Sequence, residues 1–277
     1  MPELPEAEVV ARQLRDRILG ATIKECWVGR EDIVRRGMTM LPWYRGARIV
    51  GVERHGKCVA LACERDGDTR YVVAELGMTG LLLFGPLVPR YQKHTHCVLT
   101  LDGGQASDLR YWNPRRFGRL SLLDRAGLEQ FVSRRFGCDP LAVSWEDFRS
   151  LVRGRRGRLK PLLMHQQVIA GIGNIYANEI LFRARLHPAR LVRRMDELAL
   201  RRLYRVMRQV LTQAIEDGGS SVRDFFAPDG SEGRYRRRHL VYGKAGRRCP
   251  SGCGGTIRRL LGTDQRSSFY CPLCQRK

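Results

Sequence analysis

The spacing of hydrophobic residues changes along the chain. Near the N-terminus, Val10 and Leu14 belong to an apolar face at helical spacing that begins behind Pro5 and stops at Gly20. Residues 21–123 instead carry short apolar runs between turn residues, at 49–52, 58–62, 71–74 and 97–101. Strands at such regular intervals predict a β-sandwich or a barrel.

The second half of the chain has the longer apolar period of helices. A basic, polar stretch at 220–238 is interpreted as a mobile loop, and a short Cys-bearing segment follows it. Helices are predicted at residues 146–152, 161–168, 174–184 and 195–216. We therefore predict a multidomain α+β protein, with an N-terminal helix plus β-sandwich at 1–130, a helical domain with the loop at 131–235, and a C-terminal β-hairpin segment at 236–277.

The net charge of the chain indicates what kind of partner it binds. Fifty Lys and Arg residues stand against 28 Asp and Glu residues, which gives a formal net charge of +22. Polyanions are the expected partners of so basic a protein: DNA, RNA or an anionic lipid surface. No apolar run approaches the ~20 residues of a membrane-spanning helix, and the acidic, proline-bearing N-terminus does not resemble a secretory signal. We expect an intracellular, cytoplasmic monomer.

The nine cysteines fall into two groups. Cys249-x3-Cys253 and Cys271-x2-Cys274 have the spacing of a four-thiolate zinc site, in which each pair sits on a tight turn. Because cysteine supplies all four ligands, the expected Zn²⁺ is a single structural ion whose binding helps a short module to fold. The others are expected to be free buried thiols: Cys26, Cys58, Cys63, Cys97 and Cys138.

Further stretches match a known family. They read PELPE at 2–6, LGMTG at 76–80, NPRRFG at 113–118, GIGNIYANE at 171–179 and DQRSSFYC at 264–271. In this order along the whole chain they resemble the bacterial formamidopyrimidine-DNA glycosylases of base excision repair. The resemblance implies a bifunctional glycosylase/AP lyase that removes oxidised purines (Fapy, 8-oxoguanine) from duplex DNA near the nucleoid. It also implies that the central domain is a helix–two-turn–helix and the last segment a zinc-finger hairpin.

The resemblance assigns the chemistry to four residues. Removal of Met1 would leave Pro2 with a secondary amine, and an α-amine has a pKa of only about 7.7–8.0. Its attack on the deoxyribose C1′ atom would give a cationic iminium, an electron sink that permits β- and then δ-elimination. Glu3 is implied as the general acid on the sugar ring oxygen, Lys57 as the acid for β-elimination, and Arg266 as the residue for phosphate binding and δ-elimination.

Three residues are implied to open the duplex, because a base inside the stack is out of reach of an enzyme. By the family match, Met78 and Phe117 enter the gap that the extruded nucleotide leaves, and Arg115 faces the orphaned base. Residues 220–235 correspond to the family's loop over a flipped oxidised purine.

Other residues are predicted to hold the DNA. His94 matches a DNA-contact position of the family. Asn174, together with backbone N–H groups of the glycine-flanked segment before it, would bind a phosphate. Arg155 and Lys160 belong to a basic run that we expect to follow the DNA backbone.

The chain also departs from the family pattern. The first cysteine pair has three intervening residues rather than two, Glu75 stands where a His is usual, and His165 replaces a usual Asp. A carboxylate at Glu75 that faced DNA would be repulsive, so the lesion preference stays open. One alternative is an endonuclease VIII-like glycosylase for oxidised pyrimidines. The other is a non-catalytic, zinc-dependent binder of damaged DNA.

Overall fold

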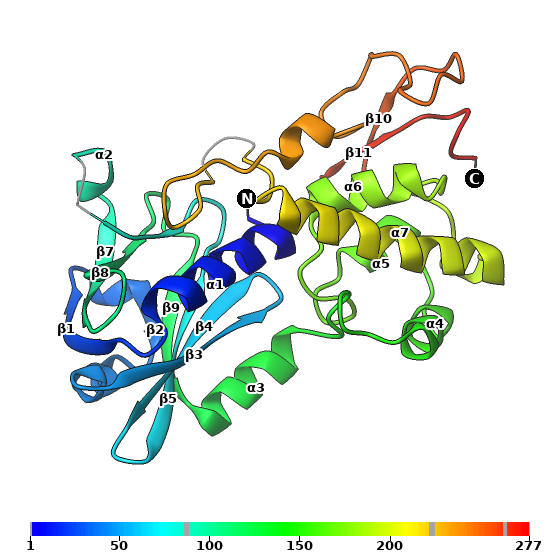
Figure 1. The fold of residues 1–277 in the computed structure, drawn as a ribbon. Helices are drawn as coiled ribbons and strands as arrows, with labels where there is room; N and C mark the ends of the chain where they lie inside the picture. The colour runs from blue at the N-terminus through cyan, green and yellow to red at the C-terminus, as the bar shows by residue number, and fades with distance from the viewer. Residues whose placement is uncertain (1, 86–88, 222–224, 263–264, 277) are drawn as a thin grey trace. The chain divides into compact units, whose positions relative to one another are not determined.

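The computed structural model of the chain describes residues 2–85, 89–221, 225–262 and 265–276. These residues form two compact units (Figure 1). Unit 1 consists of residues 1–134 and 217–236, and unit 2 of residues 135–216 and 237–277. The predicted domain boundaries at 130/131 and 235/236 stay a prediction.

Unit 1 begins with the predicted helix and continues as strands. Helix α1 spans Leu4–Ile18, and a short α2 spans Pro89–Gln92. The strands are β1 (Thr22–Val28), β2 (Val34–Arg36), β3 (Arg48–His55), β4 (Cys58–Arg65), β5 (Asp68–Glu75), β6 (Leu81–Leu83), β7 (Thr95–Asp102), β8 (Asp108–Trp112) and β9 (Arg119–Asp124). The 3₁₀ helices η1 (Glu31–Ile33) and η2 (Met38–Tyr44) flank β2, and α3 (Arg125–Arg135) follows β9.

The strands make the predicted β-sandwich. They form one sheet in the order β2-β9-β5-β4-β3-β1-β7-β8-β6, and β3 meets β1 through the pair Thr22–Arg48. That short junction is the corner at which the sheet turns into a second layer. Inward-facing residues of both layers, such as Leu61 and Leu99, share one buried cluster. The fold expectation for this part of the chain is confirmed.

Helix α1 packs along this sandwich (Figure 1). Its apolar face is fully buried at Leu14 and Ile18, as the helical period predicts. Pro5 lies in the first turn, where a missing N–H costs no intrahelical hydrogen bond. The helix therefore fixes the position of the N-terminal residues relative to β3.

The segment 217–236 belongs to unit 1 and is anchored there. Phe225 is 5% exposed and lies in the sandwich core, and the backbone N–H of Phe84 donates to Pro228 O at 2.9 Å. Tyr235 is buried, and its N–H donates to Gly219 O at 3.0 Å. Phe225, Pro228 and Tyr235 therefore anchor this segment to unit 1, while residues 229–232 are exposed. Its mobility stays a prediction, and residues 222–224 lie outside the described residues.

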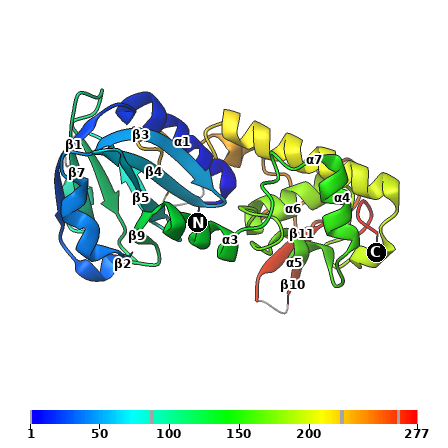
Figure 2. The ribbon, with the colours of Figure 1, turned by 90° about the horizontal axis from the view of Figure 1, so that it is seen from below.

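Unit 2 is helical with a C-terminal hairpin (Figure 2). Its helices are α4 (Trp145–Arg153), α5 (Leu159–Leu163), α6 (Asn174–Arg183), α7 (Glu197–Glu216) and the 3₁₀ turns η3 (Val192–Arg194) and η4 (Tyr235–Arg238), the last of which begins in unit 1. The hairpin pairs β10 (Arg258–Leu261) with β11 (Ser267–Tyr270). Helix α5 ends five residues earlier than the predicted 161–168, because the Gln166 side chain closes a loop there instead. Its Nε2 donates to Met164 O and Ile172 O.

Two other expectations can be compared with the described residues. No described helix is long and apolar enough to cross a membrane. The five scattered cysteines are free thiols, and Cys58, Cys63 and Cys97 are buried as expected. Cys26 and Cys138 are only half-buried.

Candidate functional site

The first turn of α1 buries two carboxylates beside Pro2. Glu3 and Glu6 are each 1% exposed, and Pro2 is buried as well. Glu3 caps the helix: its side chain accepts from the N–H of Glu6, and its own N–H donates to Glu6 Oε2 at 2.7 Å. This reciprocal pair fixes the backbone at Glu3, the residue that directly follows Pro2.

Glu6 also holds a distant part of unit 1. Its Oε1 atom accepts a hydrogen bond of 2.6 Å from the N–H of Ser220. Gly219 has a φ of +82°, and a Cβ atom at this position would lie 3.0 Å from the same Glu6 oxygen. The base of the 217–236 segment is therefore tied directly to the N-terminal turn.

Lys57 lies in the tight turn between β3 and β4 and is half-buried. Arg54, 8% exposed at its side chain, connects this turn to α1. Its Nε donates to Glu8 Oε2 at 2.9 Å, and its Nη1 donates to Gly56 O at 3.3 Å. The Lys57 turn is thus fixed to the same helix that carries Pro2 and Glu3.

Two loops of unit 1 present large exposed apolar side chains. Met78 is 40% exposed and Phe117 is 63% exposed, which is unusual for residues of this size. The loops touch through glycines: a Cβ on Gly77 would lie 2.4 Å from Gly118 N, and one on Gly118 would lie 2.1 Å from Glu75 O. Only residues without a side chain permit this approach, so the two loops form one platform.

Buried polar groups hold the platform in place. Tyr111 Oη donates a hydrogen bond to Glu75 O at 2.7 Å and accepts one from Asn113 Nδ2 at 2.9 Å. Burial of the Tyr111 hydroxyl raises its pKa. The ring of His94 lies 6.2 Å from that of Trp112, and His94 O accepts from Asn113 N at 2.9 Å. His94 therefore lies beside the loop that carries Arg115 and Phe117.

Arg115 is exposed, and its guanidinium lies 5.6 Å from the centre of the Phe117 ring, within cation–π range. The structure thus groups Met78, Arg115 and Phe117 as the sequence predicts, although their role remains a prediction. Glu75 is half-buried at the end of β5 and lies opposite Arg119 in the β5–β9 ladder, so a cation accompanies this carboxylate.

In unit 2, Asn174 is the first residue of α6 and is half-buried. The N–H of Gly171 was expected to face a phosphate, but it donates to Gln166 Oε1 at 2.9 Å. That expectation is wrong for Gly171, because the loop uses this donor to hold itself. Asn174 O accepts the amide of Asn178 at 2.6 Å, which fixes the start of the helix.

Lys160 does not lie on the surface. It is 4% exposed, and its Nζ donates to Ser267 O at 2.7 Å and to Ser268 Oγ at 3.0 Å. A lysine so placed cannot follow a DNA backbone, so this part of the prediction is corrected. Its ammonium instead fixes strand β11 to helix α5, because a buried charge requires partners.

Arg155 and Arg266 are both exposed. Arg155 lies in the loop between α4 and α5, and Arg266 lies directly before β11. Arg266 lines a surface hollow together with Arg158 and Pro161, which places Arg266 beside the start of α5. Both arginines therefore lie on the surface of unit 2.

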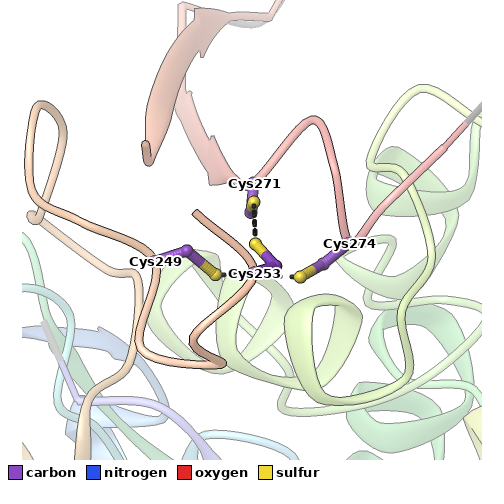
Figure 3. Close-up of side chains that lie close together, drawn as sticks. All are labelled: Cys249, Cys253, Cys271 and Cys274. Atoms are coloured by element: carbon purple, nitrogen blue, oxygen red, sulfur yellow. Dashed lines mark hydrogen bonds between the residues drawn. The ribbon is translucent and has the colours of Figure 1, made fainter. Parts of the chain in front are cut away.

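The four clustered cysteines converge as a candidate metal centre (Figure 3). All four Sγ atoms lie within 4.8 Å of one another, with Cys249–Cys274 at 3.7 Å and Cys253–Cys271 at 3.5 Å. A tetrahedral Zn²⁺ with bonds of about 2.3 Å separates its sulfur ligands by about 3.8 Å. The Gly255 N–H lowers the pKa of Cys253 to about 7, which favours a thiolate. The cluster can hold a metal ion.

Buried side chains of α6 fix this C-terminal segment. Glu179, fully buried, accepts hydrogen bonds of 2.9–3.0 Å from the N–H groups of Leu240, Val241 and Tyr242. Asn178 Oδ1 accepts from Phe269 N at 2.6 Å. The hairpin is therefore held by polar contacts as well as by any metal.

Sequence reasoning missed several of these contacts. Glu6 reads from sequence as an ordinary acid at a helix start, although its spacing from Glu3 is that of a capping box. The dense hydrogen bonding of Glu179 and the link made by Arg54 involve residues far apart in the chain. No local pattern indicates them.

Comparison with known proteins gives a consistent result. A model of the formamidopyrimidine-DNA glycosylase N-terminal domain matches residues 1–120, and a model of the H2TH domain of the same enzymes matches residues 136–226. The formamidopyrimidine-DNA glycosylase of Heliobacterium modesticaldum is 41% identical over 286 residues, covering 100% of both chains.

Solved structures agree with this similarity. The MutM (Fpg) protein from Thermus thermophilus is 39% identical with a TM-score of 0.85, covering 99% of this chain and 98% of that one. A Lactococcus lactis Fpg mutant in complex with a Fapy-dG containing DNA is 32% identical with a TM-score of 0.88, covering 100% of both chains.

Proposed function

Because the chain belongs to the formamidopyrimidine-DNA glycosylase family, we propose that the buried turn at Pro2 and Glu3 excises Fapy and 8-oxoguanine from duplex DNA. The protein is an oxidised-purine DNA glycosylase of base excision repair with the AP lyase activity characteristic of the family. Its partner is damaged double-stranded DNA. Such a substrate agrees with action at the nucleoid in the cytoplasm.

The nucleophile is the nitrogen of Pro2 after Met1 has been removed. An α-amine with a pKa of about 7.7–8.0 is partly unprotonated at neutral pH, so its lone pair is available. The nitrogen bonds to C1′ while the bond from C1′ to the base breaks; the base leaves with that electron pair and takes up the proton that the amine loses. Opening of the sugar ring then turns the adduct into an iminium, and the ring oxygen accepts a proton from Glu3.

The iminium makes the C2′ hydrogen acidic, because the positive nitrogen accepts the electron pair that deprotonation releases. Loss of that proton expels the 3′ phosphate, and a second elimination expels the 5′ phosphate. Lys57 supplies the proton-transfer group for the first elimination, and its position on the turn held by Arg54 supports this role. Arg266 binds the phosphate that leaves in the second step.

The exposed platform of unit 1 keeps the duplex open. Met78 and Phe117 fill the space of the extruded nucleotide, and Arg115 offers hydrogen bonds to the base left without a partner. His94 and Asn174 contact the backbone, as does Arg155. Lys160 is assigned to support of the hairpin rather than to DNA contact.

The cysteine cluster is proposed to hold one structural Zn²⁺ through Cys249, Cys253, Cys271 and Cys274. When bound, the ion cross-links the two turns of a segment whose own buried core is small. The chain's own residues Glu179, Asn178 and Lys160 then orient the hairpin and Arg266.

One observation carries the proposal: the capping pair of Glu3 and Glu6 fixes the first turn of α1 directly after the buried Pro2. Single-turnover excision from duplexes with 8-oxoguanine, dihydrouracil or an abasic site tests it. We expect faster excision of 8-oxoguanine than of dihydrouracil, and strand cleavage at the abasic site. The Glu3→Gln variant should lose base excision, while Glu25→Gln, which changes an exposed carboxylate on β1, should not.

The same assay separates the alternatives. Preference for dihydrouracil would identify a glycosylase for oxidised pyrimidines. Binding to every duplex without excision or cleavage would identify a non-catalytic binder of damaged DNA.

A further inference from the structure

Arg155, proposed above to contact the DNA backbone, is one of a group of arginines in unit 2, and the others have no part in the proposed function. The arginine surface is formed by Arg155, Arg156, Arg158, Arg190, Arg193 and Arg194. They line two adjoining hollows that share Leu191, and the remaining lining residues are small or aliphatic apart from Arg153. Two chain segments that are far apart in the sequence thus place their guanidinium groups on one surface.

The backbone holds the two segments together. Val192 N donates to Gly157 O at 3.0 Å, and Leu159 N donates to Arg190 O at 2.9 Å. Gly157 has a φ of +100°, a conformation that disfavours residues with a side chain. The arginines are therefore presented by a defined pairing of two loops rather than by one loose loop.

Few acids balance this charge. Glu197 Oε2 accepts hydrogen bonds from Arg149 Nε at 3.0 Å and from Arg153 Nη2 at 2.7 Å. Asp196 Oδ2 lies 3.9 Å from Arg190 Nη2. Within residues 2–85, 89–221, 225–262 and 265–276, no carboxylate lies within ion-pair distance of Arg155, Arg156, Arg158, Arg193 or Arg194. Guanidinium groups gathered without counter-charges repel one another, and a polyanion would relieve that repulsion.

The surface is continuous with the proposed phosphate ligand Arg266. Arg158 and Ala189 line the arginine surface and also the hollow that Arg266 lines. Among the described residues, no aromatic side chain lines any of the three hollows, so these residues offer no platform on which unpaired bases could stack. Arginine guanidinium groups can donate two parallel hydrogen bonds to phosphate oxygens, and such contacts to a nucleic-acid backbone do not depend on its base sequence.

We propose that the arginine surface binds the phosphate backbone of intact duplex DNA flanking the lesion. This inference rests on the proposed function, because it extends the DNA path from Arg266 across Arg158 to the loop between α4 and α5. Its contribution is independent of sequence and of the lesion. It increases affinity for long duplexes and leaves the chemical step unchanged.

The test compares the full-length protein with an Arg156→Glu/Arg193→Glu variant, which changes one residue from each paired segment. The control variant is Arg125→Glu/Arg205→Glu, which makes the same change of charge at exposed arginines outside the three hollows. Binding is measured against salt on lesion duplexes of about one helical turn, ~10 base pairs, and of about three turns. Single-turnover 8-oxoguanine excision is measured on the short duplex.

Each phosphate contact contributes about 0.9 to the slope of log affinity against log salt. On the long duplex we expect the Arg156/Arg193 variant to lose about 2 in slope relative to the control. On the short duplex, affinity and excision should match the parent. Equal losses in the test and control variants, or no loss in either, would overturn the inference. So would an equal loss on short and long duplexes, which would place the arginines at the lesion itself.

Failure of the proposed function would look different. In that case the parent protein would not excise 8-oxoguanine from the short duplex at all, whatever the salt slope on long DNA.

Discussion

Glu6 Oε1 accepts a 2.6 Å hydrogen bond from the backbone N–H of Ser220, a residue 214 positions away in the chain. The other oxygen of the same carboxylate accepts from Glu3 N at 2.7 Å. One buried side chain therefore joins the turn that carries the proposed nucleophile to the segment that the family resemblance places over the flipped base.

Glu6→Gln should weaken this link between the N-terminal turn and Ser220. A glutamine side chain has one acceptor oxygen, so one of the two N–H groups would face its NH₂ group and lose its partner. We expect a loss of about 1–3 kcal/mol in the free energy of unfolding, measured by urea denaturation. Base excision should fall more than strand cleavage at a preformed abasic site. Glu25→Gln is the matched control. Equal stability and equal excision by the two variants would argue against a structural link through Glu6.

Phe117→Ala should separate duplex opening from folding. The side chain is 63% exposed, so its loss should change the free energy of unfolding by no more than about 0.5 kcal/mol. Excision of 8-oxoguanine from a fully paired duplex should nevertheless slow, because the gap left by the extruded base is no longer filled. Excision from a lesion inside an unpaired bubble should change little. A similar decrease on both substrates would contradict a wedge role.

The ion pair of Glu8 with Arg54 predicts an acid-dependent stability. Although burial disfavours the charged form, hydrogen bonds from Arg54 and Arg12 lower the pKa of Glu8 below its ordinary value. A carboxylate whose pKa is lower in the folded state stabilises the fold above its unfolded pKa, and this stabilisation is lost as the pH falls through the folded value.

Urea denaturation of the parent and of Glu8→Gln between neutral and acidic pH measures this effect. The difference in stability should be constant near neutral pH, at about 1–3 kcal/mol, and should shrink at pH values below the ordinary range of a glutamate. A difference that stays constant throughout, or grows in acid, would show that the charge of Glu8 does not stabilise the fold.

Metal removal should act on DNA binding. Cys253→Ala removes one sulfur from the four-cysteine cluster and should abolish the stoichiometric zinc that we expect by elemental analysis. Duplex affinity should fall with it, because Arg266 lies on the hairpin that the ion supports. Cys26→Ala, which removes a half-buried thiol from β1, should keep the zinc content and the duplex affinity of the parent. Tight DNA binding by a zinc-free protein would contradict a structural role.

The sequence predicts the local elements of this protein well. The period of Val10, Leu14 and their neighbours correctly indicates α1, and the short apolar runs at 58–62 and 71–74 correctly indicate two strands of the sandwich. The end of α5 is missed because the side chain of Gln166, rather than a helix-breaking residue, closes the following loop.

The candidate site was only partly predictable. Motifs identify Glu3, Phe117 and the cysteines, since their spacing or family match is visible in the chain itself. Whether a charged residue is exposed depends on contacts between distant segments. Lys160 reads as part of a basic surface, yet strand β11, more than a hundred residues later, buries it.

The proposed reaction depends on a covalent bond between the nitrogen of Pro2 and the sugar. Borohydride reduction during turnover of an 8-oxoguanine duplex converts the iminium into a stable amine, and mass spectrometry of the digested adduct then locates the attached sugar. We expect a peptide that begins at Pro2, without Met1, and carries the modification on its N-terminal nitrogen. A modification on Lys57 or another lysine, or active protein that still retains Met1, would contradict it.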